Sequence, residues 1–333
     1  MNKYFTAQQC VNYFRTRWGR KVALCRTKPV TLCLFVTDKC TLNCKWCLRQ
    51  TDPGFEVRQR PDMSLERAKR ILSYFPATSH LSLAGFGEPL LVEDLFMIMA
   101  EAVKRPMRMS IITNGTLIRD RLDEILNADL HSLSISINSL DSAGYQQICG
   151  GGEYTFDNVL EGIRMLTRKR KSSGPHVRIS FVLSRDLLDR TEEIIKFAEE
   201  MQVDGLDLHN IIQHDSHKGY QGMLTDDDEE VIRRLSEWRR KNYRVQIGWP
   251  KLIKKGLFRP ERICNPSWDW LGIDVEGNTA GCSKAMPTKR EYGNLFIEGN
   301  QVWNNEFRES LRAGFLKREF PYDCCKTCTE IQP

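Results

Sequence analysis

The sequence lacks the long apolar run of a membrane-spanning helix, because no stretch approaches the roughly 20 apolar residues that a bilayer requires. Residues 1–20 are mixed polar and basic and lack the apolar segment of a signal peptide. A composition of 41% hydrophobic and 28% charged residues also excludes a disordered, collagen-like or fibrous chain. We therefore expect a soluble, cytoplasmic globular protein, whose 333 residues are enough for a substantial core.

A strong charge of one sign is also absent. The formal net charge of +6 fits an anionic substrate, such as a nucleotide sugar or nucleic acid, or simply a basic surface. No basic stripe interleaved with aromatic residues is present, so the sequence disfavours nucleic acid as a partner. The basic clusters at 164–171 and 233–241 are typical of solvated helix faces.

Cysteine is the exception in this ordinary composition, with 12 residues. In a reducing compartment they are better explained as metal ligands or reactive thiols than as disulfides. Most fall into a group of three and a group of four: Cys40, Cys44 and Cys47, and Cys264, Cys282, Cys325 and Cys328. The others are Cys10, Cys25, Cys33, Cys149 and Cys324.

Short β-rich runs alternate with helical patterns between residues 31 and 248. This alternation favours an α/β fold with a parallel sheet, as a partial barrel or a doubly wound open sheet. In either architecture ligands gather at the C-terminal ends of the strands. The expected strands are 31–37, 80–85, 108–112, 131–137, 177–183, 205–210 and 244–248. The expected helices are 64–74, 92–104, 117–127, 157–171, 189–201 and 226–241, and capping boxes begin two of them, Asp189 with Glu192 and Thr225 with Asp228.

The character of the sequence changes after about residue 250, where prolines and tryptophans replace the alternation. Two short β-like runs, 271–275 and 278–282, flank a hairpin turn at Gly277, and a short helix is expected at 304–313. We predict a lead-in segment at 1–30, a barrel at 31–248 and a small appendage at 249–333. Metal should stabilise the appendage, since so short a segment makes a weak core unaided.

The group Cys40, Cys44 and Cys47 directly follows the first expected strand. Thiolates at this spacing on one loop can bind three of the four irons of a cubane, which leaves the fourth iron open. An open position distinguishes a catalytic metal from a structural one. Zinc would need a fourth ligand nearby, yet no other Cys or His lies between Cys33 and His80.

The spacing C-x3-C-x2-C, with Trp46 just before the third cysteine, resembles the signature of the radical S-adenosylmethionine (radical SAM) superfamily. A second match follows the next expected strand. There Gly85-Phe86-Gly87-Glu88-Pro89 resembles the family's GGEP motif, with Phe86 in place of the usual second glycine. The resemblance extends over about residues 31–328.

This resemblance implies a partial (β/α)6 barrel and a [4Fe–4S] cluster whose fourth iron chelates the amino and carboxylate groups of SAM. An external reductant, such as flavodoxin or ferredoxin, would supply the electron that cleaves SAM to methionine and a 5′-deoxyadenosyl radical. That radical would abstract hydrogen from a substrate. Trp46 would lie near the adenine, and backbone groups of residues 85–89 would bind the SAM amino group.

Three later strand ends resemble other positions around SAM. Thr113 and Asn114, and then Ser136 and Asn138, resemble positions that meet its methionine or ribose part. Ser136 and Asn138 share a strand face by alternation, although ordinary polar strand-end residues remain the alternative. His209 ends the sixth expected strand, where it could equally contact SAM, contact the substrate or be structural.

The second cysteine group reads C-x12-G-x4-C from Cys264 to Cys282, followed by C-x2-C at Cys325 and Cys328. It resembles the SPASM/twitch domain of radical SAM maturases and sugar dehydrogenases, in the short twitch version with one auxiliary [4Fe–4S] cluster. Ligation by four thiolates leaves no open iron, which suits electron transfer. Cys324 is an alternative to Cys325, and a structural zinc ion is an alternative to the cluster.

The motifs indicate the substrate and the reaction type less specifically than they indicate the family. Cys149, in a glycine run that we expect to be a flexible loop at the catalytic rim, resembles the hydrogen-donating cysteine of radical SAM epimerases, or is simply unreactive. We expect oxidation or rearrangement of a small sugar-like or amino-acid-like metabolite. The alternatives are epimerisation, peptide or protein modification, nucleic-acid modification and a non-catalytic iron–sulfur electron carrier. SAM cleavage would separate the carrier from the enzymes.

Overall fold

A nine-stranded sheet is the framework of the computed structural model. The structure describes residues 5–19, 21–45, 47–51, 60–211, 222–254, 263–282 and 292–320, together with Cys325 and Cys328. In spatial order the strands are β7-β6-β5-β4-β3-β2-β1-β8-β9. Their bounds are β1 Thr31–Phe35, β2 His80–Ala84, β3 Arg108–Thr113, β4 Ser132–Ser136, β5 His176–Val182, β6 Gly205–His209, β7 Gln246–Gly248, β8 Trp270–Asp274 and β9 Thr279–Ala280.

The pairings from β7 through β1 to β8 are all parallel, and β9 alone pairs antiparallel, with β8. This confirms the predicted α/β partial barrel. The helices are α1 Ala7–Trp18, α2 Leu48–Thr51, α3 Leu65–Tyr74, α4 Leu95–Val103, α5 Leu122–Asn127, α6 Ser142–Cys149, α7 Thr155–Lys169, α8 Thr191–Glu200, α9 Glu229–Arg239, α10 Pro266–Asp269, α11 Leu295–Glu298 and α12 Glu306–Leu316. None of the helices that the structure describes is long and apolar enough to cross a membrane.

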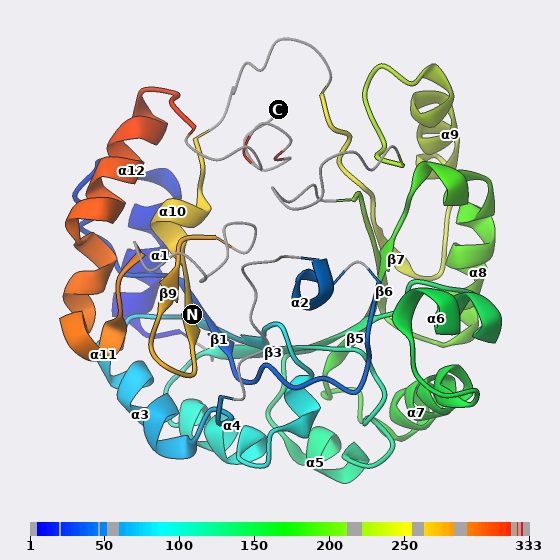
Figure 1. Cartoon of the computed structure of the whole chain (residues 1–333), viewed down its shortest axis with the longest axis horizontal. Coiled ribbons are helices and arrows are strands. Elements are labelled where there is room, and N and C mark those ends of the chain that lie inside the picture. Colours follow the sequence, from blue (N-terminus) through cyan, green and yellow to red (C-terminus); the bar gives the residue numbers. More distant parts are fainter. Residues whose placement is uncertain are drawn as a thin grey trace.

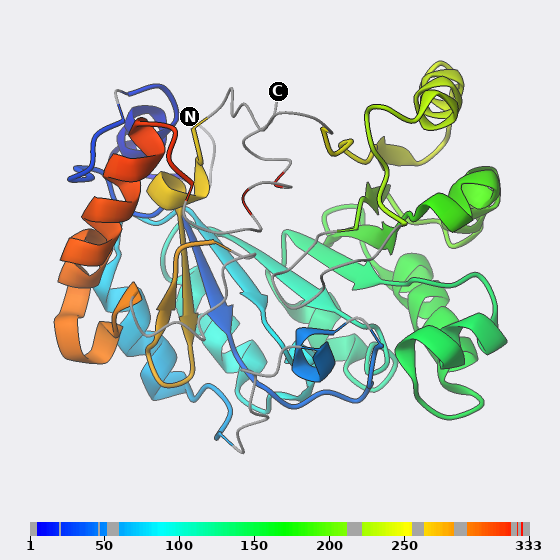
Figure 2. The same cartoon turned by 45° about the horizontal axis from the view of Figure 1, so that its top comes forward.

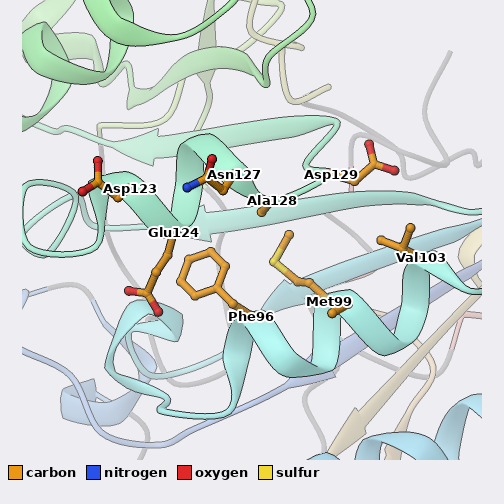
Figure 3. Close-up of a pocket in the computed structure, with 9 residues that line it drawn as sticks. Phe96, Met99, Val103, Asp123, Glu124, Asn127, Ala128 and Asp129 are labelled. Atoms are coloured by element: carbon orange, nitrogen blue, oxygen red, sulfur yellow. The ribbon is translucent and has the colours of Figure 1, made fainter.

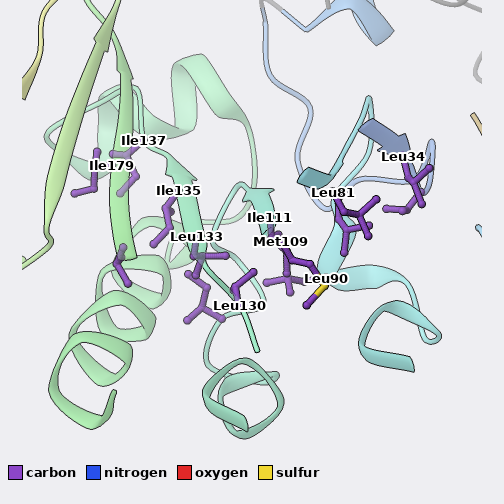
Figure 4. Packing of buried hydrophobic residues seen from close by; sticks show 14 of the residues in the cluster. Leu34, Leu81, Leu90, Met109, Ile111, Leu130, Leu133, Ile135, Ile137 and Ile179 are labelled. Carbon is purple, nitrogen blue, oxygen red and sulfur yellow. The ribbon is translucent and has the colours of Figure 1, made fainter. Parts of the chain in front are cut away.

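The sheet curves, with helices α3, α4, α5, α7 and α8 on its outer side and α2 on its inner side (Figure 1). The turned view places α2 near the arrowhead ends of the central strands (Figure 2). Strand side chains alternate between the two faces. Leu32 and Leu34 join the main core under the helices, whereas Cys33 and Phe35 form a separate inner cluster with Ala84. Figure 4 shows the outer-face packing around β3 and β4.

The N-terminal segment contains a helix that the sequence analysis missed. Thr6 caps α1 by accepting a hydrogen bond from the Gln9 backbone N–H, and the Gln9 side-chain oxygen accepts one from the Thr6 backbone N–H, which completes a capping box. Gln9 Nε2 also donates to the carbonyl oxygens of Thr78 and Pro106, both at 2.7 Å. Gln9 therefore ties α1 to the loops that precede β2 and β3.

Both capping boxes predicted from the sequence are wrong. Asp189 lies within a 3₁₀ helix, Arg185–Arg190, and pairs with Arg234 instead of capping α8. Asp228 itself caps α9 by accepting a hydrogen bond from the Val231 N–H at 3.1 Å.

The C-terminal part continues the main sheet. Every residue of β8 pairs with a residue of β1, from Thr31 with Trp270 to Phe35 with Asp274. The expected hairpin forms β8 and β9, and Gly277 lies at its turn with φ of 86°. The division of the chain at residue 249 stays a prediction, but the strands on its two sides belong to one hydrogen-bonded ladder.

Candidate functional site

The loop that carries Cys40, Cys44 and Cys47 runs from the end of β1 to α2, and all three side chains are half-buried. Its backbone is held from outside the loop. Asn43 N–H donates to the Cys149 carbonyl at 3.0 Å, and Lys45 N–H donates to the Ile148 carbonyl at 2.8 Å. The C-terminal turn of α6 therefore fixes the course of the chain between the cysteines.

Burial raises the pKa of the Cys40 and Cys47 thiols, while the nearby Arg49 charge lowers it. A hydrogen bond with Cys149 and then burial raise the pKa of Cys44. Within the described ranges, no three His, Cys, Asp or Glu side chains are placed to hold a single metal ion. A cubane cluster needs a wider arrangement of ligands than a single metal ion does, because each thiolate binds a different iron atom. Three neighbouring thiols beside a cationic arginine fit that group.

The segment after β2 is joined to the cysteine loop through Gly87. Its N–H donates to the Thr37 carbonyl at 3.0 Å, and the Glu88 N–H donates to the Lys39 carbonyl at 2.7 Å. A Cβ at Gly87 would lie 2.2 Å from the Lys39 oxygen, so only glycine fits there. Phe86 is buried, with its ring stacked on Phe35 at 5.6 Å. The departure from the family motif thus fills space on the inner face of the sheet.

Glu88 connects the ends of β2 and β3. Its buried carboxylate accepts hydrogen bonds from Thr113 Oγ1 at 2.7 Å, Asn114 N–H at 2.7 Å and Leu90 N–H at 3.0 Å. Burial raises the pKa of Glu88, and these three donors oppose the rise. Asn114 Nδ2 then donates to Thr41 Oγ1 at 3.0 Å and contacts Cys40 Sγ at 3.5 Å. Glu88, Thr113 and Asn114 therefore act together to position the first cysteine.

The remaining positions compared with SAM contacts lie along the same rim. Pro89 is buried and begins a 3₁₀ turn, and Ser136 is half-buried at the end of β4. Asn138 Oδ1 accepts a hydrogen bond from the Val182 N–H at 3.0 Å, which joins the ends of β4 and β5. His209 is exposed at the end of β6. Trp46 lies outside the described residues, and the SAM contacts of all these residues stay predictions.

Cys149 does not lie in a flexible glycine loop, as the sequence suggested. It is the last residue of α6, which Asp141 caps at the other end, and it is only 2% exposed. Gly150 ends the helix with φ of 72°, so the glycine run marks a helix terminus. The neighbouring Cys44 side chain lowers the pKa of the Cys149 thiol, and burial opposes this effect.

Sequence reasoning missed an ion pair on the inner face of the barrel. Arg178 on β5 donates to both carboxylate oxygens of Asp207 on β6, each at 2.6 Å, and to Gln246 Oε1 at 3.0 Å. The hydrogen bond to Asp207 raises the pKa of Arg178. Gly205 and Gly248 make room for the pair, since a Cβ at either would lie within 2.4 Å of its charged atoms. An arginine inside a β-run was the available signal, but its partner lies on another strand.

Hydroxyl groups occupy much of the remaining inner face. By strand register and alternation, serines from four neighbouring strands share that face with Arg178. They are Ser82, Ser110, Ser132, Ser134, Ser136 and Ser180. Donors and acceptors of this kind bind polar groups of a ligand better than an apolar wall does.

The second cysteine group is partly described. Burial first, and then the neighbouring Cys282 and Cys328 thiols, raise the pKa of Cys264 to about 12. Ser267 Oγ donates to Cys264 Sγ at 3.7 Å, and the Cys328 N–H donates to the Cys325 carbonyl at 3.1 Å. Cys264 is buried and Cys282, Cys325 and Cys328 are half-buried, and their shared ligation of a metal centre stays a prediction. Cys324 lies outside the described residues.

Arg60 links the two cysteine regions. It donates to Asp38, beside the first cysteine loop, at 2.6 and 2.8 Å, and to Asp274 at the end of β8 at 2.6 Å. The three side chains are only 10%, 4% and 3% exposed. A nearly buried cation therefore joins the chain before Cys40 to the hairpin that leads to Cys282.

A cavity of about 540 Å³ lies away from these groups, between α4 and α5. Figure 3 shows Phe96 and Met99 at its apolar floor and Asp123, Glu124 and Asp129 around its rim. It opens on the helical side of the sheet, whereas the Arg178–Asp207 pair lies on the inner side.

Comparison with known proteins identifies the family. The model of the radical SAM superfamily matches residues 34–198. A GTP 3′,8-cyclase of Synechococcus elongatus is 31% identical over 72% of this chain and 70% of that enzyme. This chain belongs to the radical SAM superfamily. The cofactors of that family are a [4Fe–4S] cluster and SAM.

Other similar proteins match different shares of this chain. A GTP 3′,8-cyclase of Aeromonas hydrophila is 32% identical, but the match spans only 47% of this chain and 46% of that enzyme. A tungsten-containing aldehyde ferredoxin oxidoreductase cofactor-modifying protein of Pyrococcus furiosus is 22% identical over 90% of this chain and 86% of the relative. SuiB of Streptococcus suis bound to S-adenosylmethionine shares the fold, with a TM-score of 0.63 and 18% identity over 91% of this chain and 72% of SuiB.

Proposed function

We propose that this radical SAM enzyme abstracts hydrogen from a small, hydroxyl-bearing metabolite and rearranges or oxidises it. The observation that carries the proposal is the inner face of the barrel, where the Arg178–Asp207 pair stands among serine hydroxyls. Such a face can hydrogen-bond a sugar-like or amino-acid-like substrate and hold it in one orientation. Positioning of this kind decides which hydrogen is removed.

In this proposal Cys40, Cys44 and Cys47 hold the cluster, and the strand ends at Gly85–Pro89, Asn114, Ser136 and Asn138 hold SAM. When reduced, the cluster supplies the electron that cleaves SAM to methionine and the 5′-deoxyadenosyl radical. Gly87 holds the cysteine loop against β2, and Glu88 orients Asn114 toward Cys40. These residues maintain the arrangement of the loop while the substrate is bound.

A second [4Fe–4S] cluster at Cys264, Cys282, Cys325 and Cys328 would serve in electron transfer. Soft thiolates are suitable ligands for iron–sulfur clusters. Cys264 is buried and Cys282, Cys325 and Cys328 are half-buried, which supports a site shielded from solvent. Arg60, between the two regions, would fix their relative position.

The names of the relatives sharpen the choice of substrate. Several relatives are named GTP 3′,8-cyclase. Cyclisation of GTP is a rearrangement of a hydroxyl-rich purine nucleotide. Nucleotides therefore come first in the panel of candidate substrates, followed by sugars, amino acids and peptides. The net charge of +6 agrees with an anionic substrate of this class.

The test is deuterium transfer. Anaerobically reconstituted enzyme is given SAM, a reductant and each candidate deuterated at carbon, and 5′-deoxyadenosine is examined by mass spectrometry. A substrate of the proposed class transfers deuterium. Deuterium transfer from a peptide, and from no small metabolite, would overturn the proposal in favour of peptide modification.

Variants of the ion pair test the proposed position of the substrate. We expect Asp207→Asn and Arg178→Lys to lower kcat/KM by roughly ten- to a hundredfold, the loss of one charged hydrogen bond. The slow SAM cleavage that occurs without substrate should persist, because the cysteine loop is unchanged. Arg233→Met, which breaks an exposed pair with Glu237, is the control. Unchanged kcat/KM in both inner-face variants would place the substrate elsewhere.

A further inference from the structure

Helix α1 has its polar side buried and its apolar side exposed, which is the reverse of an ordinary surface helix. Its buried side chains are all polar, namely Gln9, Asn12 and Thr16. The apolar side chains Val11, Phe14 and Trp18 follow one another at helical spacing on the exposed side. Phe14 is 57% exposed and Trp18 is 68% exposed, so two large rings face the surroundings of the protein.

Hydrogen bonds of the buried side hold α1 in this orientation. Asn12 Nδ2 donates to the Lys28 carbonyl at 3.0 Å, and Asn12 Oδ1 accepts from the Lys28 N–H at 2.8 Å. Gln9 makes its two bonds to the loops before β2 and β3. Turning the helix to bury its rings would break these bonds and leave buried polar groups without partners, which is unfavourable. The aromatic side therefore stays outward.

The exposed rings of α1 form a cluster. Phe14 stacks on Trp18 with ring centroids 5.1 Å apart, and Tyr13 meets the two rings edge-on at 6.0 and 6.1 Å. Single exposed apolar side chains are common, whereas a contiguous exposed group marks an interaction site. We call this group the α1 surface and define it as Val11, Tyr13, Phe14, Arg15, Arg17 and Trp18.

The charge of the α1 surface is positive. Residues 1–37 contain seven Lys and Arg and no Asp or Glu, which exceeds the net charge of +6 of the whole chain. Arg15 and Arg17 are exposed on the helix itself. The sequence analysis, which found no basic stripe interleaved with aromatic residues, overlooked this helix. Two copies of the surface would repel each other, so an acidic partner fits it better than a second copy of the chain does.

The α1 surface lies beside the second cysteine group. Helix α1 is next to α10 (Figure 1). In the segment that follows α1, the Val22 carbonyl accepts a hydrogen bond from Trp268 Nε1 at 2.9 Å. Trp268 and Ser267 both belong to α10, and Ser267 Oγ donates to Cys264 Sγ at 3.7 Å. A partner bound to the α1 surface would therefore be next to the segment that carries Cys264.

The composition of α1 favours a protein as the partner. Tyr, Trp, Phe and Arg are enriched at the centres of protein–protein interfaces, where Lys is depleted. Helix α1 contains all four of the enriched types and no Lys. Rings that are already in contact with each other also lose little freedom when a partner covers them.

We propose that the α1 surface is the docking site of an acidic electron-carrier protein, which reduces the enzyme from the side of the second cysteine group. This inference rests on the proposed function, because only a reductive reaction needs such a carrier. Each SAM that is cleaved requires one electron. The reduced carrier loses that electron and is oxidised, and the enzyme accepts it.

The test compares two reductants in the reconstituted full chain. Reduced flavodoxin serves as the acidic carrier, and dithionite is a small reductant that needs no docking site. We expect Arg15→Glu/Arg17→Glu and Phe14→Ser/Trp18→Ser to lower kcat/KM for flavodoxin in SAM cleavage by roughly tenfold or more at low salt. The rate with dithionite should not change. Added salt should slow the flavodoxin reaction of the wild type and have less effect on the charge variant.

Binding of oxidised flavodoxin, measured by calorimetry, tests the docking site without the reaction. Affinity should fall in both α1 variants and persist in Cys40→Ala/Cys44→Ala/Cys47→Ala, which has lost SAM cleavage. Two control variants make matched changes elsewhere and should bind flavodoxin normally. Arg164→Glu/Arg168→Glu reverses two exposed charges on α7, and Ile297→Ser removes an exposed apolar side chain of α11. Thermal unfolding of every variant should match that of the wild type.

Unchanged flavodoxin affinity and kcat/KM in both α1 variants would overturn the proposal, and so would a wild type that does not bind flavodoxin. Binding of anionic phospholipid vesicles or single-stranded RNA that both α1 variants lose, while they bind flavodoxin normally, would assign the surface to a membrane or to nucleic acid. Normal flavodoxin binding by a wild type that cleaves no SAM with dithionite would support the docking site and count against the proposed function alone.

Discussion

The two cysteine groups differ in how the chain holds them. The first occupies one loop, from Cys40 to Cys47, and the rest of the barrel contacts that loop through Asn114, Gly87 and the end of α6. The second draws on separate segments, at Cys264, Cys282 and Cys325–Cys328, which lie up to 64 residues apart in the sequence. The cysteines of the first site thus lie on one short loop that the barrel holds in place, whereas those of the second come from segments far apart in the sequence. Metal binding should therefore contribute to folding mainly at the second site.

Loss of the first cysteine group should give the largest functional effect. We expect about eight irons per chain in the reconstituted enzyme and about four in the Cys40→Ala/Cys44→Ala/Cys47→Ala variant. SAM cleavage should disappear from the variant, while its thermal unfolding changes little. Iron and sulfide analysis after anaerobic reconstitution measures this.

About four irons in the wild type, none in the variant and zinc in both would show that the second site binds a structural zinc ion. The electron-transfer role would then fail, and rearrangement or epimerisation would replace oxidation.

Arg60→Met should give the largest loss of stability, because it leaves Asp38 and Asp274 charged, buried and without their cation. Breaking a buried pair in this way costs about 3–5 kcal/mol. Anaerobic denaturant unfolding measures the change, with Arg233→Met as an exposed-pair control expected to lose less than about 1 kcal/mol. Equal losses in both would show that the Arg60 bridge does not join the two regions.

Gly87→Ala should damage the first site selectively. The added Cβ would meet the Lys39 and Thr37 carbonyl oxygens at 2.2 and 2.7 Å, so the cysteine loop must shift at a cost of about 1–3 kcal/mol. We expect weaker SAM binding in an equilibrium titration and unchanged iron at the second site. Gly152→Ala, whose Cβ has only an ordinary contact at 3.8 Å, is the matched control. Unchanged SAM binding in Gly87→Ala would contradict the proposed close approach.

Glu88 should give the smallest effect, a change in pH dependence. Its pKa is raised in the folded chain, so the folded state binds the proton more tightly than the unfolded state does. The stability that comes from this group is present below the ordinary pKa of 4.5 and is lost as the pH rises through the raised value. Glu88→Gln should remove that loss, so the stability of the variant should fall less than that of the wild type as the pH rises. Unfolding at pH 5 and pH 7 measures the difference, and identical slopes in both proteins would count against it.

The alternation of β-runs and helical patterns was enough to predict the barrel strands closely, because each strand has an apolar outer face. The prediction failed where local signals were ambiguous. The run Cys149-Gly150-Gly151-Gly152 suggested a loop, yet Gly150 is the glycine that ends α6. Asp141 was an N-cap signal for this helix that the prediction did not use. In the same way, the box at Thr6 and Gln9 that begins α1 was present in the sequence but not used.

Long-range pairs in the site were beyond prediction from sequence alone. Strand alternation places Arg178 on a face, but only the register between β5 and β6 brings Asp207 beside it. The same holds for Cys149 and Asn43, which meet because α6 returns to the first loop. Residue spacing within one loop predicts cysteine groups such as Cys40–Cys47 well, whereas contacts between strand ends depend on the assembled sheet.

The parallel ladder between β1 and β8 has a consequence for motion and electron flow. Separate domains usually move about a linker, but here the strand that leads to Cys40 and the hairpin that leads to Cys282 share five register pairs and the Arg60 bridge. The strand before Cys40 and the hairpin before Cys282 are therefore held together by one hydrogen-bonded ladder and one buried ion pair. For two clusters at these sites, the ladder and the ion pair would limit any change in the distance that an electron has to tunnel.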